Sequence, residues 1–202
     1  MPGPITHLKV AYLYNKVKGG VFEPQLYLGS ICPDSVNING HAPKDIRWPA
    51  HLRDTDLQKW FLKVKKFYND NLYKYDRSYL TGYTLHLVTD IAWDMWFDLP
   101  LFGAMQQSGI KDEHLKETRW LEIYGYEQKL IKESWCHDVI SALMTVKPIN
   151  IGTVQAMQTD VLRNRIVNFQ LEKGREPIFL NDGFMTSFFN KTIELFDKIS
   201  DL

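Results

Sequence analysis

The segment from residue 77 to residue 98 is apolar on nearly every side when it is drawn as a helix. A helix that is apolar all round is buried, so this segment is expected to run through the centre of the fold. Asp76 stands immediately before it as a plausible N-cap. The stretch "GYTLHLVTD" within the segment places His86 and Asp90 four residues apart. At that spacing both side chains lie on one helical face, so the sequence predicts a buried polar pair.

Two explanations fit a buried histidine and aspartate on one face. In the first, His86 and Asp90 form a hydrogen bond inside the core, which satisfies a carboxylate that is costly to bury alone. In the second, both side chains bind one metal ion. The pair by itself does not decide between them.

The rest of the chain is also predicted to be helical, because apolar residues recur at helical spacing and no convincing strand pattern is present. A helix capped by Asp54 is expected to follow that residue directly. The remaining helices are expected over residues 4–18, residues 112–146 as one helix or two, residues 153–171, and the segment after Asn181-Asp182-Gly183. The fold class is therefore all-α, with a single domain over residues 1–202 that forms a helical bundle.

Residues 31–53 interrupt this helical pattern and are predicted to form a long loop. They contain three prolines and a glycine, residues that are typical of turns and loops. A structureless stretch of this length in a compact domain is usually functional or disordered. This one carries Asp34, His41 and His51.

Charge and hydropathy exclude several classes of protein. The chain has 24 Lys and Arg and 24 Asp and Glu, so its zero net charge argues against a large surface for duplex nucleic acid. The most apolar segment, residues 83–104, contains three aspartates and is a poor membrane span. The start "MPGPITHLKV" lacks the features of a secretory signal, so a cytoplasmic location is expected. Cys32 and Cys136 are too few for a disulfide framework, although one bridge between them stays open.

Three further residues favour the metal interpretation of the His86–Asp90 pair. Asp34 and His51 lie at the two ends of the predicted loop, and His7 lies on the first helix. Each has an ordinary explanation when taken singly: a turn aspartate, a surface histidine and a core histidine. Together with the pair they supply neutral imidazole nitrogens and hard carboxylate oxygens, which suit a zinc ion.

The same residues stand in four motifs that occur in a characteristic order. The motifs are "MPGPITHLKVA", "YLGSICPDSVN", "AHLRD" and "GYTLHLVTDIAWD", and they span roughly the first half of the chain. This ordered series resembles the zinc-dependent phospholipase C family, which is related in fold to the S1/P1 type of nuclease. It also resembles small bacterial proteins that are assigned to that family by sequence. The resemblance implies an all-α bundle with a zinc cluster at one end of the helices.

The resemblance also implies a role for each motif residue. Asp34, His51, His86 and Asp90 would hold a first zinc ion, and Asp90 would bridge to a second ion that His7 also binds. In the family the N-terminal amine and carbonyl complete the second site. A proline after the initiator methionine usually permits its removal, so the amine of Pro2 would take this part. Asp34 would also act as the catalytic base on the attacking water.

The chain departs from the family at the third metal. The family has a histidine six residues after the bridging aspartate, where this chain has Trp96. It also has a His-x-x-x-Asp/Glu pair on a later helix, which His114 and His137 do not begin. The third site is therefore expected to be absent or rebuilt. The acidic residues Glu122, Glu127 and Glu133, the last with His137 four residues on, are interpreted as solvated helix-face residues.

The expected function is hydrolysis of phosphodiester bonds by a zinc-bound hydroxide, in the manner of phospholipase C. A nuclease or nucleotide phosphatase with the same cluster is an alternative, and so is a metal-stabilised bundle without catalysis that binds a partner. The expected ligand is a phosphoester-containing small molecule or lipid, and no oligomeric state is specified. Trp48, Trp93 and Trp96 are near enough to the motif residues to line a pocket, although core packing is the ordinary role of a tryptophan.

Overall fold

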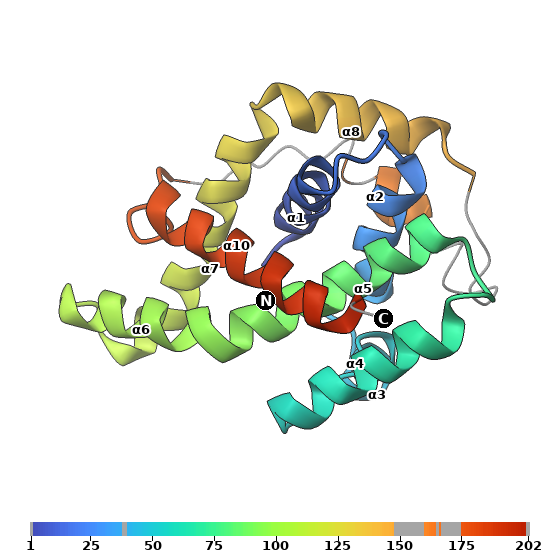
Figure 1. The fold of residues 1–202 in the computed structure, drawn as a ribbon. Helices are drawn as coiled ribbons and strands as arrows, with labels where there is room; N and C mark the ends of the chain where they lie inside the picture. Colours follow the sequence, from blue (N-terminus) through green and yellow to red (C-terminus); the bar gives the residue numbers. More distant parts are fainter. Residues whose placement is uncertain (1, 38–39, 148–159, 165, 167–174, 201–202) are drawn as a thin grey trace.

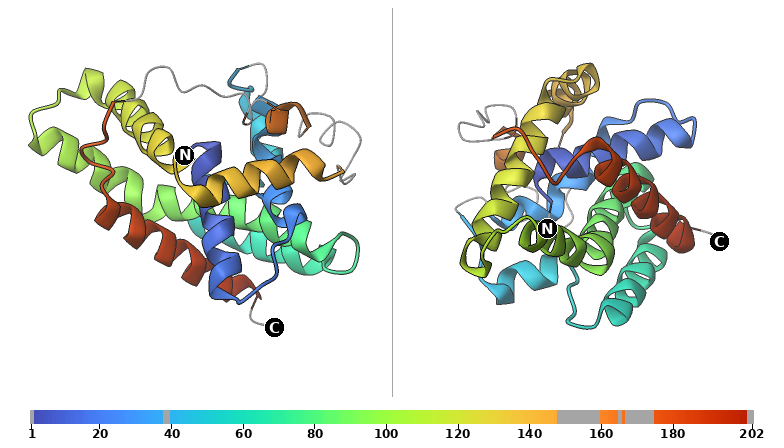
Figure 2. Two further views of the ribbon diagram at one scale, coloured as in Figure 1. Left: turned by 90° about the horizontal axis from the view of Figure 1, so that it is seen from above. Right: turned by 90° about the vertical axis from the view of Figure 1, so that its left-hand side faces the viewer.

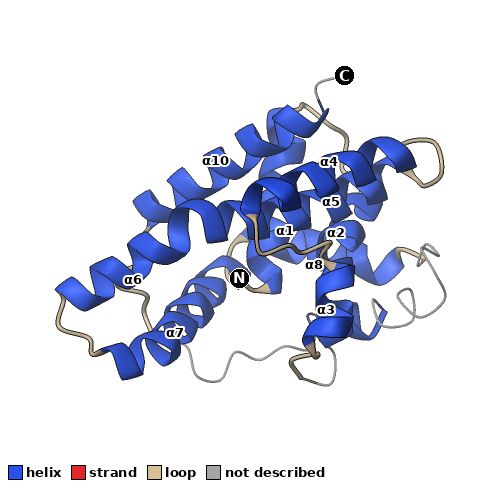
Figure 3. Ribbon diagram, turned by 90° about the horizontal axis from the view of Figure 1, so that it is seen from below, coloured by secondary structure: helices blue, strands red, loops and turns tan. Residues whose placement is uncertain are grey.

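The structure is a computed structural model that describes residues 2–37, 40–147, 160–164, 166 and 175–200. The described residues form helices joined by turns and loops, without a strand among them (Figure 3), so the all-α prediction is confirmed. The helices are α1 (Pro4–Val17), α2 (Pro24–Ile31), η1 (Cys32–Asn37), α3 (Lys44–Ala50), α4 (Leu57–Asn71), α5 (Arg77–Ala92), η2 (Trp93–Phe97), α6 (Asp98–Gln107), α7 (Asp112–Ile131), α8 (Ser134–Thr145) and α10 (Asp182–Ser200).

Helix α5 is the centre of the fold, as its apolar sequence predicts. Every residue from Tyr79 to Ala92 is buried, and the helix packs against α1, α2, α4 and α10 (Figure 1). Asp76 caps α5 as expected, because its carboxylate accepts a 2.9 Å hydrogen bond from the backbone N–H of Tyr79. The polar residues on α5 are therefore held inside the core, where their partners must come from neighbouring helices.

The predicted end of the central helix at residue 98 is wrong. The helical path continues through the π-helical turn η2 and then through α6 to Gln107. Pro100, in the first turn of α6, has no N–H to donate and would clash with a carbonyl four residues earlier in a regular α-helix. The wider turn of η2 precedes it and accommodates this change of register, so the proline bends the path without ending it.

Residues 31–53 are more ordered than the predicted loop. They contain the 3₁₀ helix η1 and the short helix α3, with Pro49 inside α3. The count of prolines and glycine therefore misled the prediction, because short helices tolerate proline near their ends. Asp54 is also not the cap of the next helix. The cap of that helix, α4, is Asp56, whose carboxylate accepts hydrogen bonds from the backbone N–H groups of Gln58 and Lys59.

The second half of the chain packs around the helices of the first half, with α7 and α8 against α1 and α8 also against α2. The predicted helical region 112–146 is divided into α7 and α8 by a break at Lys132 and Glu133. The final helix α10 packs against α5, and Phe188 meets Trp93 edge to face at 5.3 Å between ring centroids. Of the predicted helix 153–171, residues 160–164 and 166 are helical and the others lie outside the described residues.

The two ends of the chain differ in their surroundings. The start of the described chain lies within the bundle, close to α1 and α7, whereas α10 ends at the side of the bundle (Figure 2). Cys32 and Cys136 are both buried and are not joined in a disulfide, so the open question of a bridge between them is answered. In the described part of the chain, no helix is both long and apolar enough to cross a membrane, as the acidic residues of the apolar segment predict.

Candidate metal centre

Five predicted ligands converge at one buried point of the bundle. They come from four separate elements: His7 from α1, Asp34 from η1, His51 from the end of α3, and His86 and Asp90 from α5. Ligand atoms of His51, His86 and Asp90 lie within 4.8 Å of one another, and so do those of His7, Asp34 and His86. The structure therefore brings these five residues together, and their role as metal ligands stays a prediction.

Two of the imidazole rings are fixed by hydrogen bonds to backbone carbonyls. His86 Nδ1 lies 2.8 Å from the carbonyl oxygen of Ser30, and His51 Nδ1 lies 2.9 Å from that of Arg47. Because a carbonyl oxygen only accepts, both Nδ1 atoms must donate. In the neutral rings each Nε2 therefore carries a lone pair, and the two Nε2 atoms face each other at 3.3 Å. This outer hydrogen-bonding pattern is the one that orients histidine ligands around a metal.

Asp90 lies at the middle of the three imidazoles, and among the described residues no hydrogen-bond donor reaches either of its carboxylate oxygens. Its Oδ1 is 3.7 Å from His7 Nε2, and its Oδ2 is 3.7 Å from His51 Nε2 and 3.8 Å from His86 Nε2. Burial raises the pKa of this carboxyl to about 7. An ionised carboxylate in such a place needs a cation for compensation, because desolvation of an unpaired charge is very costly.

His7 is the third imidazole of the site, and neither of its ring nitrogens has a hydrogen-bond partner. Its ring stacks on that of His86 with 3.7 Å between centroids and 9° between planes. Burial, reinforced by the neighbouring His86, lowers the pKa of His7 well below its usual value. Burial also lowers the pKa of His86 to about 4. Both rings are therefore held in the neutral form that binds metals.

The fold fixes His51 from two sides although it lies between helices. Trp60 Nε1 on α4 donates a 2.8 Å hydrogen bond to the backbone carbonyl of His51, and the Tyr83 hydroxyl on α5 donates to that of Ala50. The next residue, Leu52, has a φ of 48°, in the left-handed region that is uncommon for a leucine. The chain therefore changes direction at Leu52, directly after His51 at the end of α3.

Asp34 is the ligand candidate nearest to solvent, since 15% of its side chain is exposed. Its Oδ1 lies 3.3 Å from His51 Nε2 and accepts a 2.9 Å hydrogen bond from Asn37 Nδ2. Although burial opposes its ionisation, a hydrogen bond from the protonated form of His51, together with the nearby histidines, holds the pKa of this carboxyl well below its usual range. Burial likewise opposes protonation of His51, but Asp34 and Asp90 raise its pKa. Because Asp34 is the partly exposed member, solvent reaches the cluster from its side.

The donor set fits a zinc ion or another borderline divalent metal. It contains three imidazoles and two carboxylates, which are common zinc ligands. His86 belongs to both of the overlapping groups of ligand atoms, and because its Nδ1 is bonded to Ser30, its Nε2 could serve one ion only. The buried atoms without hydrogen-bond partners, His7 Nε2 and both Asp90 oxygens, all point into the cluster. The assignment of two ions remains a prediction.

The other predicted ligand, Pro2, is buried beside Thr6, Trp93 and Tyr126, next to the N-terminal end of α1. Its role as a ligand stays a prediction. At the position where the family has a third-site histidine, Trp96 packs near Lys191, whose Nζ lies 5.6 Å from the ring centroid. Trp93 is fully buried in the core, while Trp48 lies on the wall of two surface hollows.

The interpretation of Glu122 and Glu127 as solvated residues is wrong, because both carboxylates are buried. One oxygen of Glu122 accepts hydrogen bonds from three successive backbone N–H groups, at Ile178, Phe179 and Leu180, and so anchors this segment to α7. Glu133 behaves as predicted, since its half-exposed carboxylate pairs with Lys9 at 2.7 Å. Spacing alone could not distinguish these cases, because the partners are far away in the sequence.

Glu127 caps helix α1 from another helix. No side chain of α1 itself caps its N-terminus, but Glu127 Oε1 accepts hydrogen bonds from Thr6 N at 2.9 Å and Thr6 Oγ1 at 3.1 Å. A Cβ on Gly3 would lie 2.3 Å from Glu127 Oε2, so the carboxylate fits tightly against the start of the chain. This contact holds the helix that carries His7 against α7.

Replacing Glu127 with alanine is expected to destabilise the protein by about 2 kcal/mol, because a buried N–H loses its acceptor. Urea denaturation of the metal-free protein measures this loss. Glu127→Gln is the matched variant, since its amide oxygen can still accept from Thr6, and it should recover at least half of the stability. Equal losses in the two variants would show that charge rather than capping is the important property.

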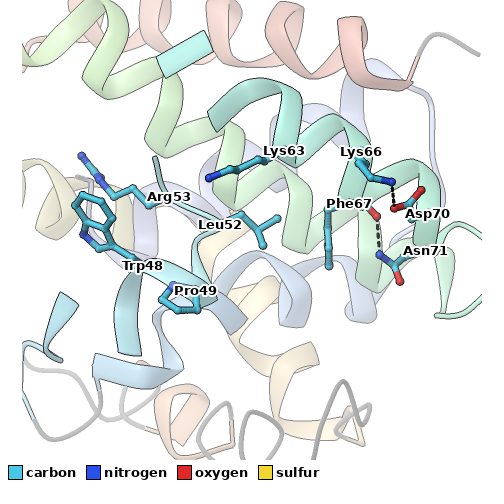
Figure 4. Close-up of a pocket in the computed structure, with 9 residues that line it drawn as sticks. All are labelled: Trp48, Pro49, Leu52, Arg53, Lys63, Lys66, Phe67, Asp70 and Asn71. Atoms are coloured by element: carbon cyan, nitrogen blue, oxygen red, sulfur yellow. Dashed lines mark hydrogen bonds and ion pairs between the residues drawn. The ribbon is translucent and has the colours of Figure 1, made fainter. Parts of the chain in front are cut away.

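Two hollows lie on the surface beside the cluster and share Trp48 and Arg53 in their walls. The first, of about 490 Å³, lies between the end of α3 and α4. Figure 4 shows Trp48, Pro49 and Leu52 on one side of it and Lys63 and Phe67 on the other. The second, of about 640 Å³, lies between α3 and the α6–α7 pair. Both are next to the segment that delivers His51.

Comparisons of the chain with protein-family models, with curated proteins and with solved structures find no match. The assignment of the site therefore depends on its geometry and on the ordered motifs.

Proposed function

We propose that the protein is a zinc-dependent hydrolase of phosphodiester bonds, similar in its chemistry to phospholipase C. The observation that supports this most strongly is the convergence of three imidazoles and two carboxylates with buried, unpartnered ligand atoms. A bundle without metal would have to keep these atoms unsatisfied at a cost of about 1–3 kcal/mol each. A structural zinc site needs only four ligands, whereas this cluster has five and one of them is partly exposed.

The roles proposed for the cluster residues follow from how deeply each is buried. His7, His86 and Asp90 are enclosed, so they would hold the metal. Zinc in such a site supplies Lewis acidity, which favours ionisation of water and neutralises charge on a phosphoryl group. Asp34 is the one partly exposed carboxylate of the cluster, and its low pKa keeps it ionised near neutral pH. It would accept a proton from the attacking water at Oδ2 or orient that water.

The proposal predicts hydrolysis of bis(p-nitrophenyl) phosphate by zinc-loaded protein, and loss of that activity after chelation. Asp34→Asn should lower kcat about 100-fold or more, because a general base contributes about 10²–10⁴. Asp45→Asn, an exposed carboxylate in the first turn of α3, is the control and should leave kcat unchanged. Release of p-nitrophenolate is followed by absorbance.

Two further substrates separate the alternatives. A preference for single-stranded DNA or for a phosphomonoester over the diester would favour the nuclease or nucleotide phosphatase. If zinc-loaded protein with confirmed metal content hydrolyses none of the three, the proposal fails, and the cluster is then part of a bundle that binds a partner.

A further inference from the structure

The hollow between α3 and the α6–α7 pair has the composition of an anion site. Four cationic side chains line it, namely Lys44, Arg47, Arg53 and Arg119, against three carboxylates, namely Asp54, Asp94 and Asp98. Each carboxylate already has a cationic partner: Asp54 pairs with Lys63, Asp94 with Arg53 and Asp98 with Arg119. Positive charge on Lys44 and Arg47 is therefore left facing the hollow.

Two guanidinium groups in the wall of this hollow have an N–H donor without a hydrogen-bond partner among the described residues. The Nε atoms of Arg47 and Arg119 are buried, and neither has a hydrogen-bond partner in the described part of the chain. Leaving such a donor unsatisfied is costly, and more so when the group is charged. A guanidinium offers its N–H groups in a planar fork that matches the oxygens of a phosphate or carboxylate. The Nε atoms themselves are enclosed, so an oxyanion in the hollow would be met by the outer N–H groups of these two side chains.

The hollow is directly connected with the metal centre through the chain. The backbone carbonyl of Arg47 holds the ring of His51, while its side chain lines the hollow. On α5 and η2, Asp94 in the wall stands one helical turn after Asp90 in the cluster. A ligand in the hollow would therefore lie near the residues that position His51.

The aromatic residues of the wall argue against a positively charged headgroup. The faces of Trp48 and Trp120 are the natural contacts for a quaternary ammonium. However, Lys44 Nζ lies 4.9 Å and Arg53 Cζ 6.0 Å from the Trp48 ring centroid, and Arg119 Cζ lies 5.2 Å from that of Trp120. Cations of the protein already occupy these faces, so a choline-type group would meet repulsion there.

We propose that this hollow binds the phosphate of an anionic phosphoester that carries no cationic group, with Arg47 and Arg119 donating to its oxygens. The inference rests on the proposed function for its biological meaning, because it assigns a class of substrate to the proposed hydrolase. It excludes zwitterionic headgroups such as phosphocholine from the preferred ligands. The number of unpaired cations is too small for a long polyanion and suits a single phosphate group.

The test is a calorimetric titration of metal-free protein with three probes: inorganic phosphate, glycerol 3-phosphate and phosphocholine. Metal-free protein keeps this test independent of the hydrolase proposal, which could fail while the anion site stands. Glycerol 3-phosphate should bind at least tenfold more tightly than phosphocholine. Arg47→Gln and Arg119→Gln should each raise its Kd about tenfold or more, as expected for losing a charged hydrogen bond.

Two controls make the result specific. Lys66→Gln removes a cation from the neighbouring hollow, where Lys66 pairs with Asp70 at 2.7 Å, and should leave the Kd unchanged. Arg119→Lys keeps the positive charge but lacks the planar guanidinium, so it should recover only part of the affinity that Arg119→Gln loses. Circular dichroism checks that each variant is folded. Absence of phosphate binding, equal affinity for phosphocholine, or a Kd unaffected by both arginine variants would overturn the proposal.

Discussion

Replacing Asp90 with asparagine is expected to reduce the zinc content of the purified protein from about two ions per chain to nearly none. The substitution keeps the shape of the side chain but removes the charge that lies between three imidazoles at 3.7–3.8 Å. Because Asp90 would bridge both ions, its loss should affect both at once. Mass spectrometry of the protein dialysed against zinc measures the metal content directly.

The same variant should have opposite effects on stability in the two metal states. Without zinc, Asp90→Asn removes a buried carboxylate whose oxygens have no donor, so the free energy of unfolding should stay equal or rise. With zinc at 100 times its Kd, the parent gains about 2.7 kcal/mol that the variant does not. For a chain of this size that corresponds to a Tm difference of about 5–10 °C.

Asp94→Asn provides the comparison for Asp90. Asp94 lies one turn further along the same helical path and pairs with Arg53, outside the cluster. Its loss should leave the zinc content unchanged. If Asp90→Asn instead destabilises the protein by the same amount with and without zinc, then Asp90 belongs to a core hydrogen bond with the histidines. That result would contradict the metal centre, and it is the alternative left open by the sequence.

The central part of this site could be predicted because it depends on local rules. Four-residue spacing on an apolar helix places His86 and Asp90 on one face, and Asp76 marks where that helix begins. The convergence of His7, Asp34 and His51 is not local, and the order of the motifs was needed to group them. Nothing in the spacing of these three residues along the chain reveals that they meet.

The buried glutamates show what the sequence could not reveal. Glu122 and Glu127 lie on a helix with polar residues on several sides, so solvent exposure was the reasonable expectation. Their carboxylates are instead enclosed because segments more than 50 and 120 residues away bring backbone N–H groups to them. Buried carboxylates of this kind depend on tertiary contacts for their hydrogen-bond donors, and neither propensity nor periodicity carries that information.

The crossing of α2 and α5 is a packing feature on which the candidate metal centre depends. Gly82 on α5 and Gly29 on α2 allow the two backbones to approach so closely that side chains cannot fit between them. A Cβ on Gly82 would lie 1.9 Å from the carbonyl oxygen of Leu26, and one on Gly29 would lie 2.1 Å from that of Tyr79. This contact also brings the carbonyl of Ser30 to His86 and leads directly into the 3₁₀ turn that carries Asp34.

Gly82→Ala is therefore expected to cost about 3 kcal/mol or more, because the obstructing atoms are backbone and the helices must separate. Its Tm should fall by about 6–12 °C. Gly103→Ala is the matched control: Gly103 lies in α6 with no atom within 4 Å of an added Cβ. There the same substitution should raise stability by about 0.5–1 kcal/mol, since alanine favours a helix. A loss of stability at Gly82 and a gain at Gly103 would show that the cost at Gly82 comes from close packing and not from helix propensity. If Gly82→Ala also loses zinc, the Ser30–His86 contact is what couples the helix crossing to the metal centre.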